Sequence, residues 1–278
     1  MAIGVSVQRK EDVRFLTGRG TYTDDINRPG QLHAHVLRSP HAHAEIAGID
    51  TATAGSAPGV AAIFTGSDLQ LAGLPCGWVV TSKNGSPMVE PPRPPLAQEK
   101  VRHVGDPVAL VVAETHEQAK DAAELIEVDY KTLPAVVASD VAIRPGSPQL
   151  FEVAPGNLCF DWHLGDKAAV DAAFSRAHHV TRLELVNNRL VSNPMEPRAA
   201  IGDYDRATGD YTLYTTSQAP HVHRLLIRRV RAPDPRAQAA GDSARCRRRL
   251  RHQRIDLSRA GAGAMGSAEA QPPRKMGR

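Results

Sequence analysis

The feature that most constrains this chain of 278 residues is an abrupt change of composition near Ile227. Residues 228–278 contain 14 Lys and Arg against 4 Asp and Glu and no aromatic residue, whereas the residues before them contain 20 and 26. The first part is mildly acidic and shows apolar periodicity, while the second is too poor in apolar side chains to bury a core. We therefore predict a folded part long enough for two domains, followed by a disordered basic tail over 228–278.

Several functional classes are disfavoured by composition. The arginines from Arg245 to Arg254 would supply phosphate contacts, but no aromatic residue lies among them for base stacking, so we favour disorder over nucleic-acid binding. Cys76, Cys159 and Cys246 lie far apart and form no C-x-x-C pair, which argues against a disulfide framework, a zinc site or an iron–sulfur cluster. The N-terminus lacks a signal-peptide pattern and no apolar run could span a bilayer, so we expect a cytoplasmic protein.

The first half of the folded part alternates strand and helix patterns. Residues 31–37 and 60–64 are predicted strands, and Pro107–Ala113 is a continuous apolar run typical of a strand buried on both faces. A helix is predicted over 116–125, because Thr115 and Gln118 have capping-box spacing and an apolar stripe follows them. This stripe consists of Ala119, Ala122, Ala123 and Ile126. A further strand is expected over 126–130, and a connector rich in Pro and Gly follows at 144–148.

The second half has strand patterns that begin at Val180. Strands are predicted over 180–190, 199–204 and 211–217, and the Thr208-Gly209 pair predicts a hairpin turn between the last two. A helix is expected to start at His221 and to be interrupted at the change of composition.

Clustered histidines and acids suggest a site that we do not favour. His33, His35, His41 and His43 invite a metal interpretation, but metal sites usually recruit ligands from separated segments, and this stretch is more typical of an edge strand that turns at Pro40. His163 and the His178-His179 pair are isolated. Asp24, Asp25 and Asp129 lie near turns or strand ends, where carboxylates commonly accept backbone hydrogen bonds.

The polar cluster Thr215–His221 is the candidate site. A predicted strand ends there and a helix begins, with Gln218 at the junction. An amide side chain can donate and accept hydrogen bonds beside a ligand that approaches a helix N-terminus. The alternative is that Ser217 or Gln218 merely caps the helix, and spacing alone slightly favours this alternative.

Five stretches resemble one known family. They are Thr17–Ile26, Arg38–His43, Pro95–Ala109 without the Gln98-Glu99 pair, Glu127–Val136 and Asn193–Arg198. Together they resemble the molybdopterin-binding large subunit of the xanthine dehydrogenase/aldehyde oxidase family, nearer its carbon monoxide dehydrogenase-like branch. The resemblance implies an α+β (mixed α/β) fold: an N-terminal extension over 1–16, an α/β hammerhead domain over 17–137 and a partial molybdopterin-binding domain over 145–227.

The resemblance also implies a chemistry. The family oxidises aldehyde, heterocycle or carbon monoxide type substrates with water-derived oxygen at a molybdenum–molybdopterin cofactor, and its electrons leave through iron–sulfur and FAD subunits. Gln218 corresponds to the glutamine that hydrogen-bonds an oxygen ligand of molybdenum, which raises its functional interpretation above capping. The family's glycine-rich cofactor loop, Gly-Gly-Gly-Phe-Gly, and its catalytic glutamate, which acts as general base, are not visible in this sequence.

The basic tail has an explanation that we state as a hypothesis, namely translation one nucleotide out of frame. With CGG arginine codons and a CTT leucine codon, Arg247–Arg251 reads Gly-Gly-Gly-Phe-Gly one base later. The pairs Met265-Gly266 and Met276-Gly277 both read as tryptophan in that frame, because ATG followed by G contains TGG. Their spacing matches tryptophans that the family carries after its glycine loop.

Three interpretations are therefore open. The first, which we favour, is a truncated large subunit that is inactive as written. The second is a split subunit completed by a second chain that carries the loop and the glutamate. The third is a non-catalytic binding module whose basic tail binds nucleic acid.

Overall fold

A computed structural model describes residues 4, 6, 9–69, 71, 73–76, 78–187, 193–194 and 198–230. Its elements in chain order are α1 (Asp12–Leu16), η1 (Thr23–Asp25), β1 (His33–Arg38), β2 (Ala44–Asp50), α2 (Ala52–Gly55), β3 (Val60–Thr65), β4 (Lys100–Val101), β5 (Pro107–Ala113), α3 (His116–Glu124), β6 (Glu127–Thr132), α4 (Ser139–Ala142), η2 (Pro155–Asn157), α5 (Lys167–Ser175), β7 (Ala200–Asp205), β8 (Asp210–Thr215) and α6 (Pro220–Val230). This mixture of helices and antiparallel sheets confirms the predicted α+β class.

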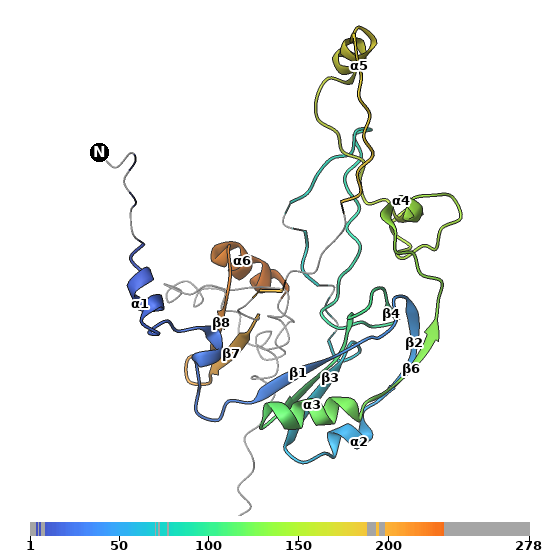
Figure 1. Cartoon of the computed structure of the whole chain (residues 1–278). Coiled ribbons are helices and arrows are strands. Elements are labelled where there is room, and N and C mark those ends of the chain that lie inside the picture. The colour runs from blue at the N-terminus through green and yellow to red at the C-terminus, as the bar shows by residue number, and fades with distance from the viewer. Residues whose placement is uncertain are drawn as a thin grey trace, which may run out of the picture.

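Strand β5 is the centre of the fold. It lies between β1 and β3 in a sheet of order β1-β5-β3 and is antiparallel to both (Figure 1). Its residues from Val108 to Ala113 are all buried. The continuous apolar run at 107–113 therefore predicted a strand covered on both faces correctly.

Helix α3 covers one face of this sheet and begins at the predicted capping box. The Thr115 hydroxyl accepts a hydrogen bond from the Gln118 backbone N–H at 3.2 Å, and Gln118 Oε1 accepts one from the Thr115 N–H at 3.0 Å. The stripe of Ala119, Ala122 and Ala123 is buried against β5 residues such as Val111. The predicted start and inward face of this helix are both confirmed.

The opposite face of the sheet is covered by the long connection between β3 and β4. Leu69 and Leu96 from this connection pack against Phe64, Leu110 and Val112. The connection is fixed to the sheet because the Ala97 N–H donates to the Pro107 carbonyl at 2.7 Å. The core therefore lies in two layers, one on each side of β5.

A second sheet has the order β4-β2-β6 and packs against the end of the first. Val101 of β4 and Ala44 of β2 share a buried cluster with Val108 of β5. A bulge interrupts the β2–β6 ladder between Ile46 and Gly48. The prediction of a strand at 126–130 is confirmed by β6, whereas β2 has no counterpart among the predicted strands.

Beyond β6 the chain makes a long excursion that carries α5 at its far end (Figure 1). Residues 158–161 are held to the β3–β4 connection, since the Val89 N–H donates to Cys159 O at 2.8 Å and the Lys83 N–H donates to Asp161 O at 2.7 Å. The strand predicted at 180–190 is wrong over 180–187, which form no strand, and residues 188–190 lie outside the described part. The physical reason is that no described strand lies beside 180–187 to complete a ladder.

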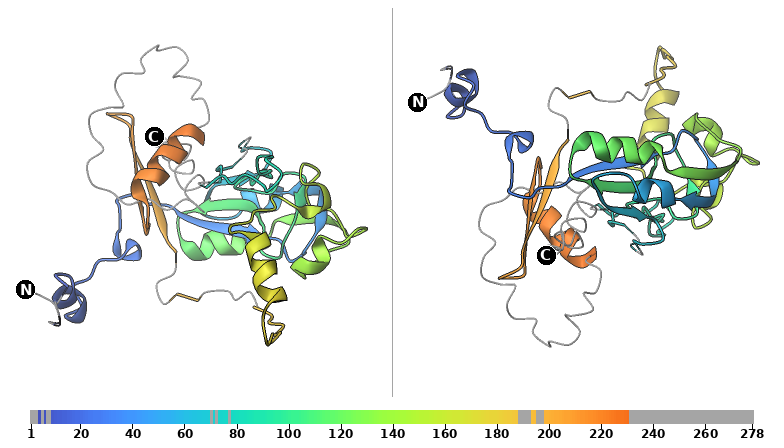
Figure 2. Two further views of the ribbon diagram at one scale, coloured as in Figure 1. Left: turned by 90° about the horizontal axis from the view of Figure 1, so that it is seen from above. Right: turned by 90° about the horizontal axis from the view of Figure 1, so that it is seen from below.

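The hairpin β7–β8 and helix α6 end the described chain. Their strands pair from Ala200 with Thr215 to Asp205 with Asp210, as predicted. Asp205 Oδ1 accepts the Ala207 N–H at 2.8 Å, and Gly209 takes the left-handed φ of 72° in the turn. Figure 2 shows this unit beside the segment that leads into β1. Within the described ranges, no helix has the length and apolar character needed to cross a membrane.

Candidate functional site

Gln218 lies in the short turn between the end of β8 at Thr215 and the start of α6 at Pro220. Its side chain is exposed, and its amide makes no hydrogen bond with any residue that the structure describes. Proline at the first helical position is common, because its missing N–H would have no partner there. The unpaired N–H groups of the first turn create a positive partial charge close to this amide.

Ser217, rather than Gln218, orders the turn. Its hydroxyl accepts the Ala219 N–H at 3.1 Å and shares a hydrogen bond of 2.7 Å with His223 Nδ1. The Thr215 hydroxyl donates to Ala199 O at 2.9 Å and so fixes the end of β8. The two residues that the sequence offered as caps therefore differ: Ser217 orders the turn before the helix, and the exposed Gln218 amide has no described partner.

An arginine from the N-terminal segment fixes the hairpin that carries this turn. Arg28 Nη2 donates to Asp203 Oδ2 at 2.5 Å and to the Tyr214 hydroxyl at 2.9 Å. The guanidinium also lies 5.2 Å from the centre of the Tyr214 ring, within the range of a cation–π contact. The contact with Asp203 is the main reason that the pKa of Arg28 is raised. No local sequence pattern signals this contact, because 186 residues separate Arg28 from Tyr214.

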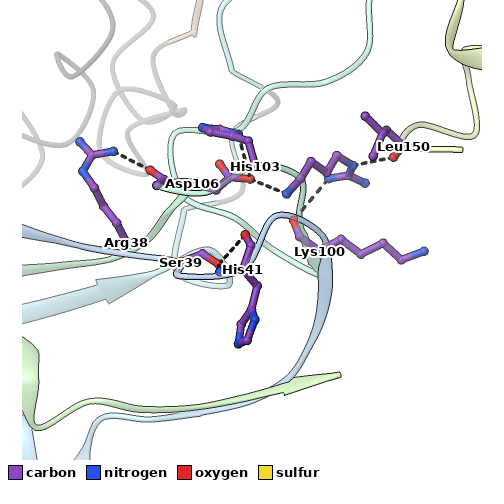
Figure 3. Close-up of polar contacts among 9 residues, drawn as sticks. Arg38, Ser39, His41, Lys100, His103, Asp106 and Leu150 are labelled. Atoms are coloured by element: carbon purple, nitrogen blue, oxygen red, sulfur yellow. Dashed lines mark hydrogen bonds and ion pairs between the residues drawn. The ribbon is translucent and has the colours of Figure 1, made fainter. Parts of the chain in front are cut away.

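The resembling stretches at 38–43 and 100–106 contact each other and have a structural role (Figure 3). The Ser39 N–H donates to Asp106 O at 2.9 Å, and Arg38 donates to Gly105 O at 2.8 Å. Asp106 Oδ2 accepts the Arg102 N–H at 2.9 Å. These bonds hold together the two loops that join the sheets.

Arg102 extends this network to the segment that follows α4. Its Nε donates to Leu150 O at 2.8 Å, and its guanidinium lies 4.4 Å from the Phe151 ring centre. Figure 3 shows the bond to Leu150 beside the loop contacts. The chain is therefore fixed to the second sheet at the point where it leaves for the α5 excursion.

The histidines of 33–43 are dispersed among different partners. His43 is buried and its Nδ1 lies 2.8 Å from Pro134 O, while His41 meets the Tyr130 ring edge-on at 4.8 Å. His35 faces His116 of α3 at 6.0 Å between ring centres. Burial, followed by the charges of His116, Lys120 and Arg38, lowers the pKa of His35. In the described part of the chain, no three His, Cys, Asp or Glu side chains gather to hold a metal.

Comparison with known families gives two consecutive matches. Residues 17–134 match the family described as aldehyde oxidase and xanthine dehydrogenase, a/b hammerhead domain, and residues 150–234 match the molybdopterin cofactor-binding domain. The carbon monoxide dehydrogenase large chain of Afipia carboxidovorans is 38% identical over 237 residues, which cover 81% of this chain and 28% of the relative. The chain belongs to the xanthine dehydrogenase/aldehyde oxidase family. The family resemblance of the sequence is confirmed.

Other members of the xanthine dehydrogenase/aldehyde oxidase family give a similar picture. The nicotine 6-hydroxylase large subunit of Paenarthrobacter nicotinovorans is 38% identical over 229 residues, covering 81% of this chain and 27% of that subunit. The quinoline 2-oxidoreductase structure from Pseudomonas putida 86 has a TM-score of 0.70 and 35% identity, covering 83% of this chain and 29% of that one. The chain thus spans less than a third of the length of these relatives.

The family assignment places the candidate residues in two parts. The loop contacts of Ser39 and Arg102 lie within the hammerhead match, whereas Gln218 lies within the cofactor-binding match. Part of the resembling stretch Asn193–Arg198 lies outside the described residues, as do Cys246 and the arginines of 247–251 on which the reading-frame hypothesis rests.

Proposed function

We propose that this chain is the N-terminal portion of the large subunit of a molybdenum hydroxylase and is inactive without further polypeptide. The supporting observation is that hammerhead and cofactor-binding matches follow each other along one chain that is 38% identical to the carbon monoxide dehydrogenase large chain. We propose domain limits of 17–137 and 145–227 for these two parts. The oxidised substrate is proposed to be an aldehyde, a heterocycle or carbon monoxide.

The described residues offer the molybdenum–molybdopterin cofactor one fitting contact. The Gln218 amide is exposed, lacks a partner among described residues and lies at a helix N-terminus, so it would hydrogen-bond an oxygen ligand of the metal. Ser217 and Arg28 would hold this amide in place through the turn and the hairpin. When bound, the cofactor would accept the two electrons that leave the substrate.

We further propose that residues 228–278 are read out of frame and that the restored sequence contains the missing glycine loop and glutamate. Resequencing the DNA that encodes residues 220–278, and continuing past the stop codon, tests this directly. An extra or missing base near the Ile227 codon, followed by family sequence, is the expected result. An intact frame with nothing family-like downstream would overturn the frameshift and favour the binding module with a basic tail.

Cofactor binding is tested by metal and pterin analysis. The purified chain of 278 residues should contain neither molybdenum nor pterin, while a frame-restored chain should contain both. In the restored chain, Gln218→Ala should lower kcat by about 100-fold, as expected for a lost hydrogen bond to a reacting oxygen. Gln98→Ala, which changes an exposed glutamine of the β3–β4 connection, is the matched control and should leave kcat unchanged. Equal effects of the two substitutions would refute the role of Gln218.

A split subunit is the second candidate, and the exposed apolar residues of 158–187 favour it. In this case a separate chain would supply the loop and the glutamate. The relatives are named as a large chain, a large subunit and a complex subunit gamma, which supports the presence of partner subunits. We propose that these partners carry iron–sulfur clusters and FAD. Co-expression with the downstream reading frame should then restore molybdenum content without any change of frame.

A further inference from the structure

The Ser217 hydroxyl takes part in two hydrogen bonds and supplies the proton of one of them. Its Oγ accepts the Ala219 N–H at 3.1 Å and lies 2.7 Å from His223 Nδ1. Among the described residues, the hydroxyl has no other acceptor for its own proton. A hydroxyl offers one donor and two lone pairs. Both groups are therefore satisfied when the Ser217 O–H donates to Nδ1 of a neutral imidazole whose ring proton is on Nε2.

His223 closes the first turn of α6 in two ways. Its backbone N–H donates to Ala219 O at 3.0 Å, as expected of the fourth residue of a helix. Its imidazole reaches further back along the chain, to the Ser217 hydroxyl. His223 is partly buried, whereas His221 is exposed and its side chain makes no hydrogen bond with any residue that the structure describes. The two histidines of this helix start are thus in different environments.

The hydrogen bonds of His223 and Ser217 fix the chain on both sides of Gln218. Ser217 is held through its hydroxyl, and Ala219 is held through both its N–H and its carbonyl. Gln218 lies between them, with an exposed amide that has no described partner. A constrained backbone that carries an available side chain is suited to presenting that side chain to a ligand, because less conformational entropy is lost on binding.

We propose that His223 is a positioning residue of the cofactor site: its imidazole accepts the Ser217 hydroxyl proton at Nδ1 and thereby fixes the backbone that carries Gln218. This inference rests on the proposed function for the use of the Gln218 amide, which lies within the cofactor-binding match at 150–234. His223 touches no atom of the cofactor in this arrangement and acts through Ser217 and Ala219. Loss of the imidazole would remove one hydrogen bond of the turn and leave the Ser217 hydroxyl free to rotate.

Nitrogen-15 NMR of the full chain, labelled at histidine, tests the hydrogen bond. At about pH 8.5, where free histidine is neutral, His223 should show an unprotonated Nδ1 and a protonated Nε2. Its two resonances are identified by their loss in His223→Asn. Ser217→Ala should move the two resonances toward each other, because both tautomers then become populated. A protonated Nδ1 in the unchanged chain, or resonances that Ser217→Ala leaves in place, would overturn the assignment.

Hydrogen exchange of the Ala219 amide in the full chain tests the positioning. His223→Phe should speed this exchange by about 10-fold, as expected when about one hydrogen bond of the turn is lost. His223→Asn should restore slow exchange, because the asparagine Oδ1 can accept the Ser217 proton in place of Nδ1. His221→Phe is the matched control and should leave exchange unchanged, since His221 is exposed. Equal exchange rates in these three variants would contradict the role of His223.

Activity of the frame-restored chain separates this inference from the proposed function. His223→Phe should lower kcat by about 10-fold, as expected when a residue that supports a cofactor contact is lost, and His223→Asn should recover most of the loss. An unchanged kcat in His223→Phe, beside a lowered kcat in Gln218→Ala, would overturn the positioning role alone. If neither substitution changes kcat, the proposed contact of Gln218 fails, and the positioning role falls with it even where the NMR result holds.

Discussion

Replacing Leu96 by alanine should destabilise the hammerhead part by about 3 kcal/mol. Leu96 is 1% exposed and packs with Phe64, Leu69 and Leu110 on the face of β5 opposite α3. The substitution removes three carbons, which accounts for about 2.4 kcal/mol at roughly 0.8 kcal/mol per buried methylene. A residual cavity adds to this, because the hydrogen bond from the Ala97 N–H to Pro107 O holds the backbone and prevents collapse into the vacated space.

Urea unfolding of the full chain, followed by far-UV circular dichroism, measures this loss. A destabilisation of about 3 kcal/mol should lower the midpoint by about 2 M for an m-value near 1.5 kcal/mol/M, without changing the m-value itself. Leu183→Ala is the matched control and should change the free energy of unfolding by less than about 0.5 kcal/mol, because Leu183 is 78% exposed. A cost below about 1 kcal/mol for Leu96→Ala, or equal costs for the two variants, would refute the packing described for the β3–β4 connection.

Three further substitutions test other parts of the fold. Burial lowers the pKa of His35 in the folded state, so the unfolded chain binds the proton more tightly. The free energy of unfolding should therefore fall as pH drops through the ordinary histidine pKa of 6.5. His35→Gln should flatten this part of the profile of unfolding free energy against pH. Thr115→Ala should cost about 1 kcal/mol in the same urea assay through loss of the α3 cap, and an unchanged midpoint would contradict the capping box. Arg28→Ala should speed hydrogen exchange of the β7–β8 amides. Arg28→Lys should restore slow exchange only partly, because lysine lacks the planar group that stacks on Tyr214. Equal exchange rates in the unchanged chain and both variants would show that Arg28 does not hold the hairpin.

Elements with complete local signals were predicted well from the sequence. Strand β5 has a continuous apolar run, and α3 has a capping box and an alanine stripe, so each is determined largely by its own residues. Strand β2, by contrast, contains Glu45, Gly48 and Asp50, and its ladder to β6 is interrupted by a bulge. It is specified by pairing with β4 and β6, which no window of the sequence displays.

The candidate site was predictable in position but not in detail. The change from strand to helix locates the Thr215–His221 turn. In the structure β8 ends at Thr215, two residues before the predicted strand end, and α6 begins at Pro220, one residue before the predicted helix start. Sequence spacing could not decide which side chain orders the turn, because Ser217 and Gln218 both precede α6 and both can accept a backbone hydrogen bond. The bond between Ser217 and His223 distinguishes them, since it engages Ser217 alone.

The distribution of buried residues explains why one half of the described chain was easier to predict than the other. Among described residues, every buried apolar residue except Ala154 and Leu213 lies between Ala44 and Ile126. Together with β1 and β6, this segment supplies both faces of its own core, so local patterns there correspond to contacts within the hammerhead part. From Trp162 to Val186 the large apolar side chains are exposed, and the strand predicted at 180–190 does not form over its described part, 180–187. Gln218 lies beyond this segment, in the unit of β7, β8 and α6, where Leu213 is the one buried apolar residue among those that the structure describes. We therefore propose that a cofactor site using its amide requires additional polypeptide, supplied by a restored reading frame or by a second chain.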